Sequence, residues 1–150
     1  MSSLTAKEVL TQETIVLNPG MKVFEVAGIL RTCRIGGAPV VDEQRNVVGV
    51  ITVTDLFRFI DKLKERLSES KGTGAPEVHK IRLETCVGDI MTRNIISVKA
   101  NTLLDEILDL MLRKNIHTLP VTAEDGKKIV GIIGRHDVCL AYLMGQAITA

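Results

Sequence analysis

A short polar segment, Thr52 to Asp55, places hydroxyl and carboxylate groups where an apolar run gives way to an amphipathic one. The Asp55 carboxylate could accept two hydrogen bonds from the adjacent hydroxyls of a sugar, and Thr52 and Thr54, on either side of Val53, could donate or accept nearby. The N–H groups of a helix starting here would favour an anion such as phosphate. The ordinary alternative is that one threonine caps the helix and Asp55 is only an acidic residue of its first turn.

A second polar cluster, in the C-terminal half of the chain, carries positive charge. Arg135 and His136 stand next to the start of another expected helix, where both could contact a phosphate group, and Asp137 supplies a carboxylate. His117 and Thr118 precede a Leu-Pro-Val run and complete this candidate set. The alternatives are that His117 is a partly buried histidine bonded to backbone and that Arg135 is a solvated surface side chain.

No arrangement of residues typical of an active site accompanies these two clusters. The three cysteines, Cys33, Cys86 and Cys139, are far apart and form no C-x-x-C pair, which argues against a zinc site and fits a reducing compartment. No glycine-rich loop of the Walker or Rossmann type occurs. We therefore expect no catalytic residue, no metal site and no enzymatic activity.

Composition narrows the class of protein further. With 150 residues, 45% of them apolar, the chain can bury one hydrophobic core, and its net charge of +1 and lack of Trp argue against a nucleic-acid binder. Apolar runs are only a few residues long, far short of the roughly 20 that span a bilayer, and the N-terminus lacks the apolar region of a signal peptide. The sequence predicts a cytoplasmic protein with no membrane segment.

The elements that must position these clusters occur twice. Gly37–Phe57 returns as Thr118–Cys139 at an offset of 81 residues, which becomes 82 after one residue is added in a turn. At the larger offset Gly134 occupies the position of Thr52, so the second copy lacks one hydroxyl. Two copies of one unit predict a pseudo-symmetric body with equivalent clefts between the copies.

Hydrophobic periodicity divides each copy into a strand, a helix, two strands and a second helix. The predicted strands are 14–17, 38–41, 47–53, 95–98, 119–122 and 129–134, and the predicted helices are 22–33, 55–70, 103–114 and a C-terminal helix that reaches Met144. This order predicts an α/β fold of the α+β type, made of two pseudo-symmetric β-α-β-β-α repeats packed as one body. The expected divisions are repeat 1 at 1–67, a linker with Ser and Gly at 68–85, and repeat 2 at 86–150.

Short motifs recur in the same order in both copies. They are Ile35, Ala38–Val40, Val48–Thr52 and Asp55 in the first copy, and Asp89–Thr92, Ile116–Val121, Val130–Ile133 and Asp137 in the second. Their duplicated order resembles the tandem cystathionine-β-synthase (CBS) domain pair, also called a Bateman module, in its stand-alone form. The resemblance covers nearly the whole chain outside the linker and the last few residues.

The resemblance implies that the chain binds adenosine-containing ligands in clefts between its two copies and alters the activity of a partner. Ser/Thr-x-x-Asp is the family's ribose-binding signature, which Thr52 and Asp55 match, and His117 matches the position of phosphate-binding histidines in the regulatory subunit of AMP-activated kinase. The candidate adenine slot consists of Ile15, Gly37, Ala38, Pro39 and Ile51. Small side chains leave the backbone there open to a base edge, although a tight packing corner would use the same residues.

The expected ligand is AMP, ADP or ATP, with S-adenosylmethionine ranking behind them, and no cofactor is required. Bound ligand would favour one arrangement of the two copies and so change the surface shown to a protein partner, whose identity the sequence does not give. The second hypothesis is an interaction module whose clefts are vestigial. Both hypotheses predict a homodimer formed by apolar helix residues, namely Phe57, Phe59, Ile60, Tyr142, Leu143 and Met144.

Overall fold

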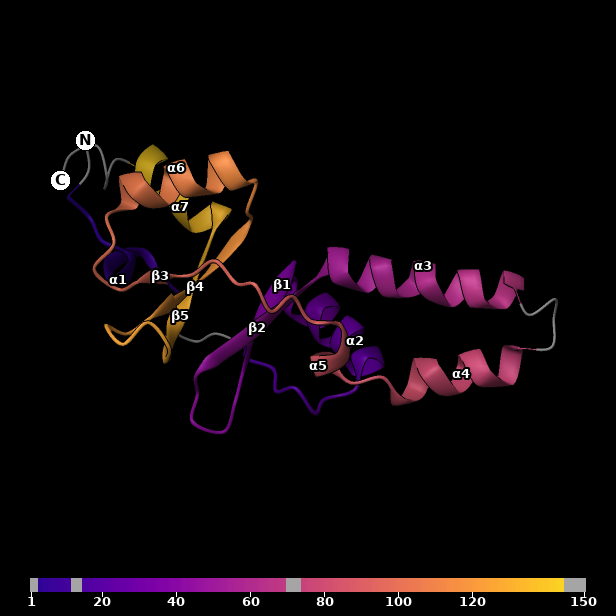
Figure 1. Cartoon of the computed structure of the whole chain (residues 1–150). Coiled ribbons are helices and arrows are strands. Elements are labelled where there is room, and N and C mark those ends of the chain that lie inside the picture. The colour runs from indigo at the N-terminus through magenta and orange to yellow at the C-terminus, as the bar shows by residue number, and fades with distance from the viewer. Residues whose placement is uncertain (1–2, 12–14, 70–73, 145–150) are drawn as a thin grey trace. The chain divides into compact units, whose positions relative to one another are not determined.

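The structure is a computed structural model that describes residues 3–11, 15–69 and 74–144 (Figure 1). Helices and strands are mixed along the chain, which confirms the predicted α+β class. Contacts between residues divide the chain into two compact units. Unit 1 comprises Met1–Ile15, Glu43–Val47 and Ile95–Ala150, and unit 2 comprises Val16–Asp42 and Val48–Asn94.

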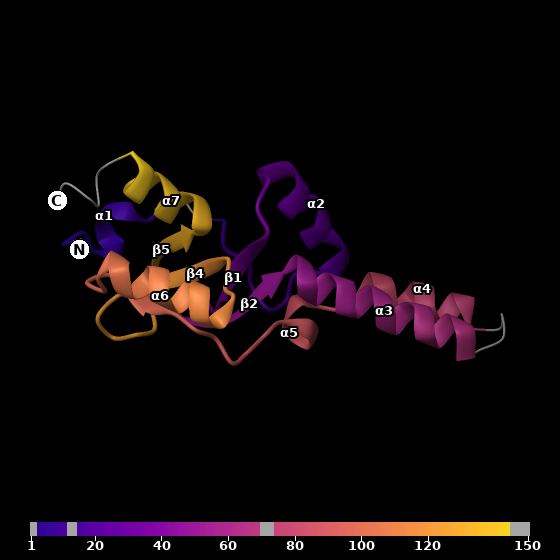
Figure 2. The same cartoon turned by 90° about the horizontal axis from the view of Figure 1, so that it is seen from above.

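In the part of the chain that the structure describes, unit 2 is built on a two-stranded sheet of β1 (Gly37–Val41) and β2 (Val47–Thr52). Leu17 adds a single parallel bridge to Val40 of β1. The helices of this unit are α2 (Val23–Cys33), α3 (Val53–Glu69), α4 (Ala75–Glu84) and α5 (Val87–Ile90). Figure 2 shows α3 and α4 lying side by side as a helical hairpin. The buried core consists of Leu17, Val26, Leu30, Ala38, Val40, Ile51, Val87 and Met91.

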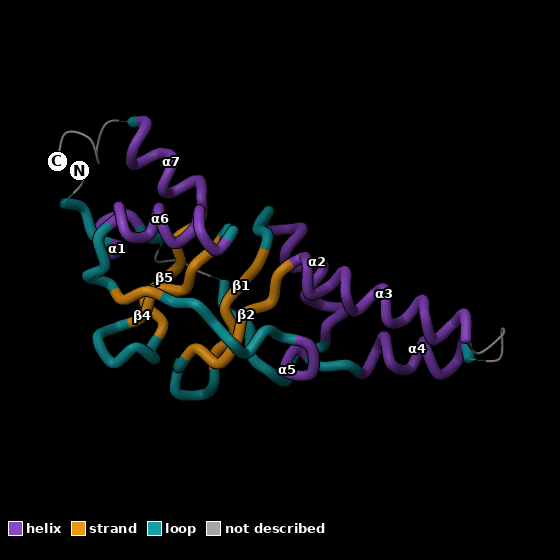
Figure 3. Tube along the Cα trace, turned by 45° about the horizontal axis from the view of Figure 1, so that its top comes forward, coloured by secondary structure: helices purple, strands orange, loops and turns teal. Residues whose placement is uncertain are grey.

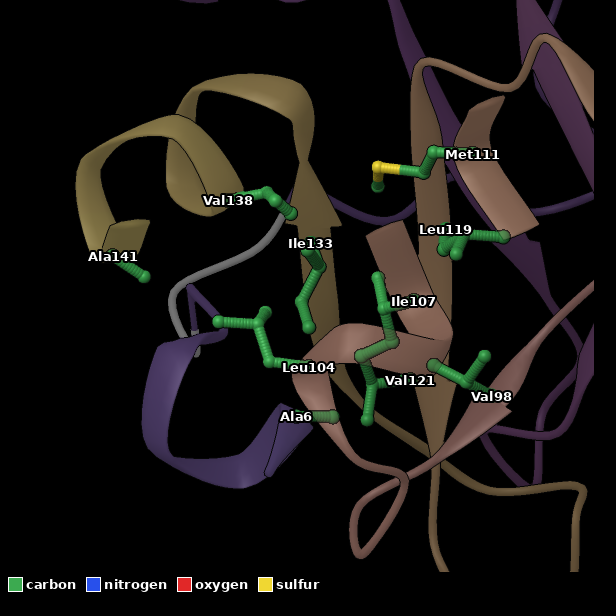
Figure 4. Close-up of a cluster of buried hydrophobic side chains, with 10 residues drawn as sticks. All are labelled: Ala6, Val98, Leu104, Ile107, Met111, Leu119, Val121, Ile133, Val138 and Ala141. Carbon is green, nitrogen blue, oxygen red and sulfur yellow. The ribbon is translucent and has the colours of Figure 1, made fainter. Parts of the chain in front are cut away.

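Unit 1, within the described residues, holds a three-stranded sheet in the order β3-β4-β5. Its strands are β3 (Val98–Lys99), β4 (Thr118–Thr122) and β5 (Ile129–Gly134), and its helices are α1 (Ala6–Val9), α6 (Leu104–Lys114) and α7 (Arg135–Leu143). Strand β3 runs parallel to β4, and β4 runs antiparallel to β5. Figure 4 shows the core side chains that these elements bury together, which are Ala6, Val98, Leu104, Ile107, Met111, Leu119, Val121, Ile133, Val138 and Ala141.

Each unit contains a strand that leads directly into a helix (Figure 3). In unit 2, β2 ends at Thr52 and α3 begins at Val53. In unit 1, β5 ends at Gly134 and α7 begins at Arg135. The two polar clusters found in the sequence therefore lie at equivalent strand-to-helix junctions, one in each unit.

One strand of each sheet pairs with the segment that begins the other repeat. In unit 2, Val50 and Thr92 exchange two backbone hydrogen bonds of 2.9 Å, and in unit 1, Thr11 and Ile132 exchange two of 2.9 and 3.2 Å. The N-terminal segment therefore belongs to the unit that contains the second hairpin, and the segment around Thr92 belongs to the unit that contains the first. The predicted repeats and the two units therefore differ. The repeats are defined by duplication of the sequence, and the units are defined by contacts between residues.

Helices α2 and α6 end in the same way. Their C-cap residues, Arg34 and Asn115, stand at equivalent positions of the two copies and have φ values of 54° and 51°. A left-handed residue at this place closes a helix, and asparagine adopts the conformation more readily than arginine. The helices predicted at 22–33 and 103–114 are confirmed to within one residue at each end.

The chain contains a helix that the sequence analysis does not predict, α4, within the expected linker 68–85. Pro76 lies in its first turn, where proline's fixed φ suits a helix start, and Val78 is buried. The Ser-, Gly- and Thr-rich residues just before α4 read as a turn and hide the helix that follows them. Residues 70–73 of the expected linker lie outside the described residues.

Two predicted strands are shorter in the structure. Of the strand predicted at 14–17, Thr14 lies outside the described residues, and Leu17 forms the single bridge to β1. Of the strand predicted at 95–98, only Val98 is extended and paired, in the two-residue β3. In the structure β3 pairs only with Val121 and Thr122, the last two residues of β4.

Candidate functional site

In unit 2, the Thr52 to Asp55 cluster lies where β2 passes into α3. The Thr52 backbone N–H donates to Asp55 Oδ2 at 2.8 Å, and the Thr52 hydroxyl donates to the same oxygen at 3.1 Å. The Asp55 backbone N–H donates in return to the Thr52 hydroxyl oxygen at 3.4 Å. Reciprocal bonds of this kind are typical of a capped helix start. The geometry therefore agrees with the alternative that Thr52 and Asp55 cap α3. Thr54 is exposed to solvent.

The Asp55 carboxylate is almost fully buried, with 6% of the residue exposed. Its other oxygen, Oδ1, accepts a hydrogen bond from the Thr92 hydroxyl at 2.9 Å and lies 3.9 Å from the Arg58 guanidinium. A carboxylate has about four acceptor positions, and hydrogen bonds from Thr52 and Thr92 fill three of them. Oδ1 therefore keeps one acceptor position for a donor from outside the protein.

In unit 1, Asp137 occupies the equivalent position at the start of α7. The Gly134 backbone N–H donates to Asp137 Oδ2 at 2.8 Å, as that of Thr52 does in unit 2. The Thr11 hydroxyl donates to Asp137 Oδ1 at 3.4 Å, as that of Thr92 does to the first carboxylate. Asp137 is half-buried. The second carboxylate is therefore the more exposed of the two and has more acceptor positions open.

A threonine stands opposite Gly134 on the neighbouring strand. Thr118 of β4 pairs directly with Gly134 of β5. In unit 2 the glycine is on the first strand and the threonine on the second, because Gly37 of β1 lies against Thr52 of β2. A Cβ at Gly37 would come within 2.8 Å of the Ile51 carbonyl oxygen. Each junction thus has one glycine and one threonine on exchanged strands. The sequence predicts that the second junction lacks a hydroxyl because of Gly134. In the structure Thr118, on the neighbouring strand, places a hydroxyl-bearing residue beside that junction.

Three residues predicted to contact phosphate lie at the same junction of unit 1. His117, Arg135 and His136 are exposed, and the Arg135 backbone N–H donates to the His117 carbonyl at 3.1 Å. The Arg135 guanidinium donates to the Ile116 carbonyl and to the Asn115 side chain, both at 3.2 Å. Arg135 thus hydrogen-bonds to the C-cap residue of α6 and to the residue that follows it. Because a guanidinium has five donors, others stay available for an anion.

The residues predicted for an adenine slot divide between the two units. Gly37, Ala38 and Pro39 lie on β1 and are buried, and Ile51 on β2 is completely buried in the core of unit 2. Ile15 is exposed and belongs to unit 1. The structure thus brings four of the five residues together. Their side chains contribute to core packing, and a contact with adenine stays a prediction.

Two residues of the junctions, Thr92 and Thr11, are absent from the predicted site residues. Each lies far along the chain from the aspartate that it contacts, by 37 and 126 positions. The signal that could have found them is their equivalence, because Thr11 and Thr92 are 81 positions apart and both lie near the start of a copy of the repeat. Aligning the two copies shows that both the threonine and the aspartate are duplicated, which could have suggested that they act together.

Two groups with a shifted pKa lie outside these junctions. Backbone N–H groups of Lys127 and Lys128 donate to Asp125 in the turn between β4 and β5 and lower the pKa of that carboxyl. Burial, followed by a hydrogen bond to Asp105, raises the pKa of Tyr142 to about 12. Among residues 3–11, 15–69 and 74–144, no group of His, Cys, Asp or Glu is placed to hold a metal ion, and no helix could cross a membrane.

A family model for the CBS domain matches the chain twice, at residues 6–62 and 87–143, and so covers more than half of it. The chain belongs to the CBS domain family. Both junction carboxylates lie inside the matched CBS regions, Asp55 in the first and Asp137 in the second. The resemblance that the sequence motifs indicate is thereby confirmed.

Solved CBS structures share this fold. CBSX2 of Arabidopsis thaliana, crystallised in complex with AMP, is 28% identical, with a TM-score of 0.75 and coverage of 95% of this chain and 98% of that one. Protein MJ1225 of Methanocaldococcus jannaschii, suggested to be an archaeal homologue of g-AMPK, is 28% identical, with a TM-score of 0.78 and coverage of 95% and 48%. The CBS domain pair of protein MJ0100, in complex with 5′-methylthioadenosine and S-adenosyl-L-methionine, is 25% identical, with a TM-score of 0.67 and coverage of 95% and 97%.

Some relatives by sequence are much longer than this CBS chain. The inosine-5′-monophosphate dehydrogenase of Methanocaldococcus jannaschii is 29% identical over 133 residues, which cover 89% of this chain and 22% of the enzyme. Protein MJ1426 of the same organism is 27% identical over 150 residues, which cover 89% of each chain. The chain therefore spans about a fifth of the dehydrogenase and most of MJ1426.

Proposed function

We propose that this chain is a regulatory module that binds an adenosine-containing ligand at its strand-to-helix junctions and thereby alters the activity of a protein partner. The observation that carries the proposal is the duplicated carboxylate, Asp55 and Asp137, held at a helix start by a backbone N–H with acceptor positions left open. The adjacent hydroxyls of ribose are donors that suit such a carboxylate. The AMP complex of CBSX2, in which the match covers 98% of the crystallised chain, supports this choice of ligand.

The ligand that we propose is AMP, ADP or ATP, ahead of S-adenosylmethionine. The exposed side chains of His117, Arg135 and His136, together with the N–H groups at the start of α7, suit phosphate oxygens. S-adenosylmethionine carries a positive sulfonium and no phosphate, so it offers these donors fewer anionic oxygens than a nucleotide does. The complex of MJ0100 with this compound keeps it among the ligands to be tested.

A binding screen tests the proposal directly. AMP, ADP, ATP and S-adenosylmethionine are added at millimolar concentration to the full chain, and at least one nucleotide is expected to raise the melting temperature. A ligand at 100 times its Kd adds about 2.7 kcal/mol to the free energy of unfolding. If none of the four moves the melting temperature and calorimetry detects no heat of binding, the ligand-binding function is refuted.

Removing each carboxylate locates the ligand. Asp55→Ala is expected to weaken nucleotide affinity by about tenfold or more while the chain stays folded, and Asp137→Ala reports on the second junction in the same way. Asp89→Ala is the matched control, because Asp89 Oδ2 accepts a hydrogen bond of 2.9 Å from the Cys86 N–H at the start of α5, outside both junctions. Unchanged affinity in both junction variants would remove the ligand from these sites.

A second candidate function is an interaction module without a ligand. Two observations favour it, because hydrogen bonds within the protein fill most of the acceptor capacity of Asp55, and Ile51 of the predicted adenine slot is completely buried. The first junction would then serve only to cap α3. The binding screen separates the two candidates, and under both of them ATP incubated with the chain is expected to remain chemically unchanged.

We also propose that the chain forms a homodimer through apolar residues of α3 and α7. The exposed members of the predicted surface are Phe57, Ile60, Leu143 and Met144, of which Leu143 is the most exposed at 82%. Phe59 is half-buried, and Tyr142 donates a hydrogen bond to Asp105, so both have less surface to offer. Light scattering is expected to give twice the mass of the chain, and a monomer at high concentration would refute the dimer.

A further inference from the structure

We infer that Thr92 is a positioning residue for the Asp55 carboxylate, and that the segment ending at Thr92 responds to bound ligand through this contact. The inference rests on the proposed adenosine-binding function. The Thr92 hydroxyl donates to Asp55 Oδ1 at 2.9 Å. This is the carboxylate oxygen that keeps an open acceptor position, so Thr92 touches the atom to which an outside donor binds.

Thr92 reaches Asp55 from a backbone that is itself held in place. Its N–H donates to the Val50 carbonyl at 2.9 Å, and its carbonyl accepts from the Val50 N–H at 2.9 Å. Val50 lies on β2 two residues before Thr52, the other partner of the carboxylate. Strand β2 therefore fixes both residues that donate hydrogen bonds to Asp55. Thr52 belongs to β2, and Thr92 belongs to the segment that pairs with it.

The segment that ends at Thr92 is also closely packed. A Cβ at Gly49 would lie 3.0 Å from the Thr92 carbonyl oxygen and 2.5 Å from the Met91 sulfur, so the segment packs closely against β2 at this point. Met91 and Val87 are buried in the core of unit 2. Because close packing resists small displacements, a change at Asp55 is passed to this segment and is not absorbed by a loose loop.

The distribution of acceptors explains why Thr92 matters to a ligand. The Thr52 N–H and hydroxyl both donate to Oδ2, so a ribose hydroxyl is accepted at the remaining position of Oδ1. The Thr92 hydroxyl sets the rotation of the carboxylate and thus the direction of that position. Without this hydrogen bond, the Arg58 guanidinium, 3.9 Å from Oδ1, would be the remaining partner of this oxygen, and the carboxylate could rotate toward it.

The second junction provides an internal comparison. Thr11 stands at the position equivalent to Thr92, and its hydroxyl lies 3.4 Å from Asp137 Oδ1 where that of Thr92 lies 2.9 Å from Asp55 Oδ1. A hydroxyl-to-carboxylate bond weakens over this range of distance. Loss of the Thr11 hydroxyl should therefore change ligand affinity less than loss of the Thr92 hydroxyl.

The test measures AMP affinity of the full chain by calorimetry. Thr92→Val keeps the shape of the side chain and removes the hydroxyl, and it should weaken AMP binding by about tenfold, whereas Thr92→Ser should restore affinity to within about threefold of wild type. In an Asp55→Ala chain the valine should have no further effect, because its partner is gone. Thr11→Val, the matched control, should change affinity by less than about threefold.

A second measurement follows the segment itself. Amide hydrogen exchange at Val50 and Thr92 reports opening of the paired backbone. AMP should slow exchange at both amides in the wild-type chain by about fivefold or more and should not do so in Thr92→Val. A purely structural role of Thr92 would change exchange in the ligand-free chain and leave the effect of AMP intact.

The outcomes separate this inference from the function on which it rests. If wild type binds AMP and Thr92→Val binds it equally well, the positioning role is overturned while the adenosine-binding function stands. An equal loss of affinity in the wild-type and Asp55→Ala backgrounds also overturns it, because Thr92 would then act without Asp55. A wild-type chain that binds none of the adenosine ligands refutes the proposed function and the role of Thr92 together.

Discussion

The junction of unit 2 and the junction of unit 1 place a carboxylate in the same way, yet the protein surrounds the two carboxylates differently. Asp55 is almost fully buried and receives three hydrogen bonds, whereas Asp137 is half-buried and receives two, one of them at 3.4 Å. The junction that keeps Thr-x-x-Asp therefore has the less available carboxylate. A motif locates a binding group, but segments far away in the sequence decide how much of that group is left for a ligand.

The helices of the two units differ in the same manner at equivalent positions. In unit 1 the Tyr142 hydroxyl of α7 donates to Asp105 of α6. The equivalent residues of unit 2 are Ile60 on α3 and Phe24 on α2, and both are exposed. Unit 1 thus joins its two helices by a polar contact, whereas unit 2 presents apolar surface at the same places, which suits a second copy of the chain.

The largest expected difference between the units concerns the glycines that face Thr11 and Thr92. In Gly131→Ala the new Cβ would lie 2.6 Å from the Thr11 carbonyl oxygen, so backbone must move. In Gly49→Ala it meets the Met91 side chain first, and a flexible methionine can turn away. We expect Gly131→Ala to lower the free energy of unfolding by about 1–3 kcal/mol and Gly49→Ala to lower it by less.

Urea unfolding measures both variants, with Gly36→Ala as the control because nothing lies within 4 Å of a Cβ at that position. A lower midpoint with an unchanged slope reports lost stability. If Gly49→Ala cost as much as Gly131→Ala, the idea that backbone crowding separates the two units would be wrong.

A smaller effect is expected from the contact between Tyr142 and Asp105. Burial, and then this hydrogen bond, raises the pKa of Tyr142 from 10.0 to about 12. Because the folded state holds the proton more tightly than the unfolded state, the contribution to stability is complete below pH 10 and is lost as the pH rises toward 12. Tyr142→Phe should cost about 1 kcal/mol at neutral pH and should remove this part of the pH dependence.

Urea unfolding of wild type and Tyr142→Phe between neutral pH and pH 12 measures this effect. The sequence contains one tyrosine, so the absorbance of tyrosinate gives the pKa of Tyr142 directly. Ionisation near pH 10, with parallel stability curves for the two chains, would show that the polar contact does not distinguish unit 1 from unit 2.

The sequence predicts the elements well where local periodicity decides them. The strands expected at 38–41 and 47–53 and the helix expected at 103–114 agree with β1, β2 and α6 to within one residue at each end, because short apolar runs and helical spacing are local properties. The contacts of Thr92 and Thr11 with the two aspartates could not be predicted in this way, since they join residues 37 and 126 positions apart. The sequence thus locates both carboxylates but not the hydrogen bonds that occupy their acceptor positions.

The smallest expected effect comes from making the second junction more like the first. Gly134→Ser adds a hydroxyl where Thr52 has one, and there is room, since the atom nearest to the new Cβ is Asp137 Oδ2 at 3.7 Å. Serine caps a helix better than glycine, and its hydroxyl can donate to Asp137 as Thr52 does to Asp55, so we expect about 0.5 kcal/mol of added stability in urea unfolding and none from Gly134→Ala. Because the new bond takes an acceptor position of Asp137, AMP affinity should not rise with stability. A gain in both would mean that the hydroxyl contacts the ligand itself, and the interpretation of Thr52 as a helix cap would then be wrong.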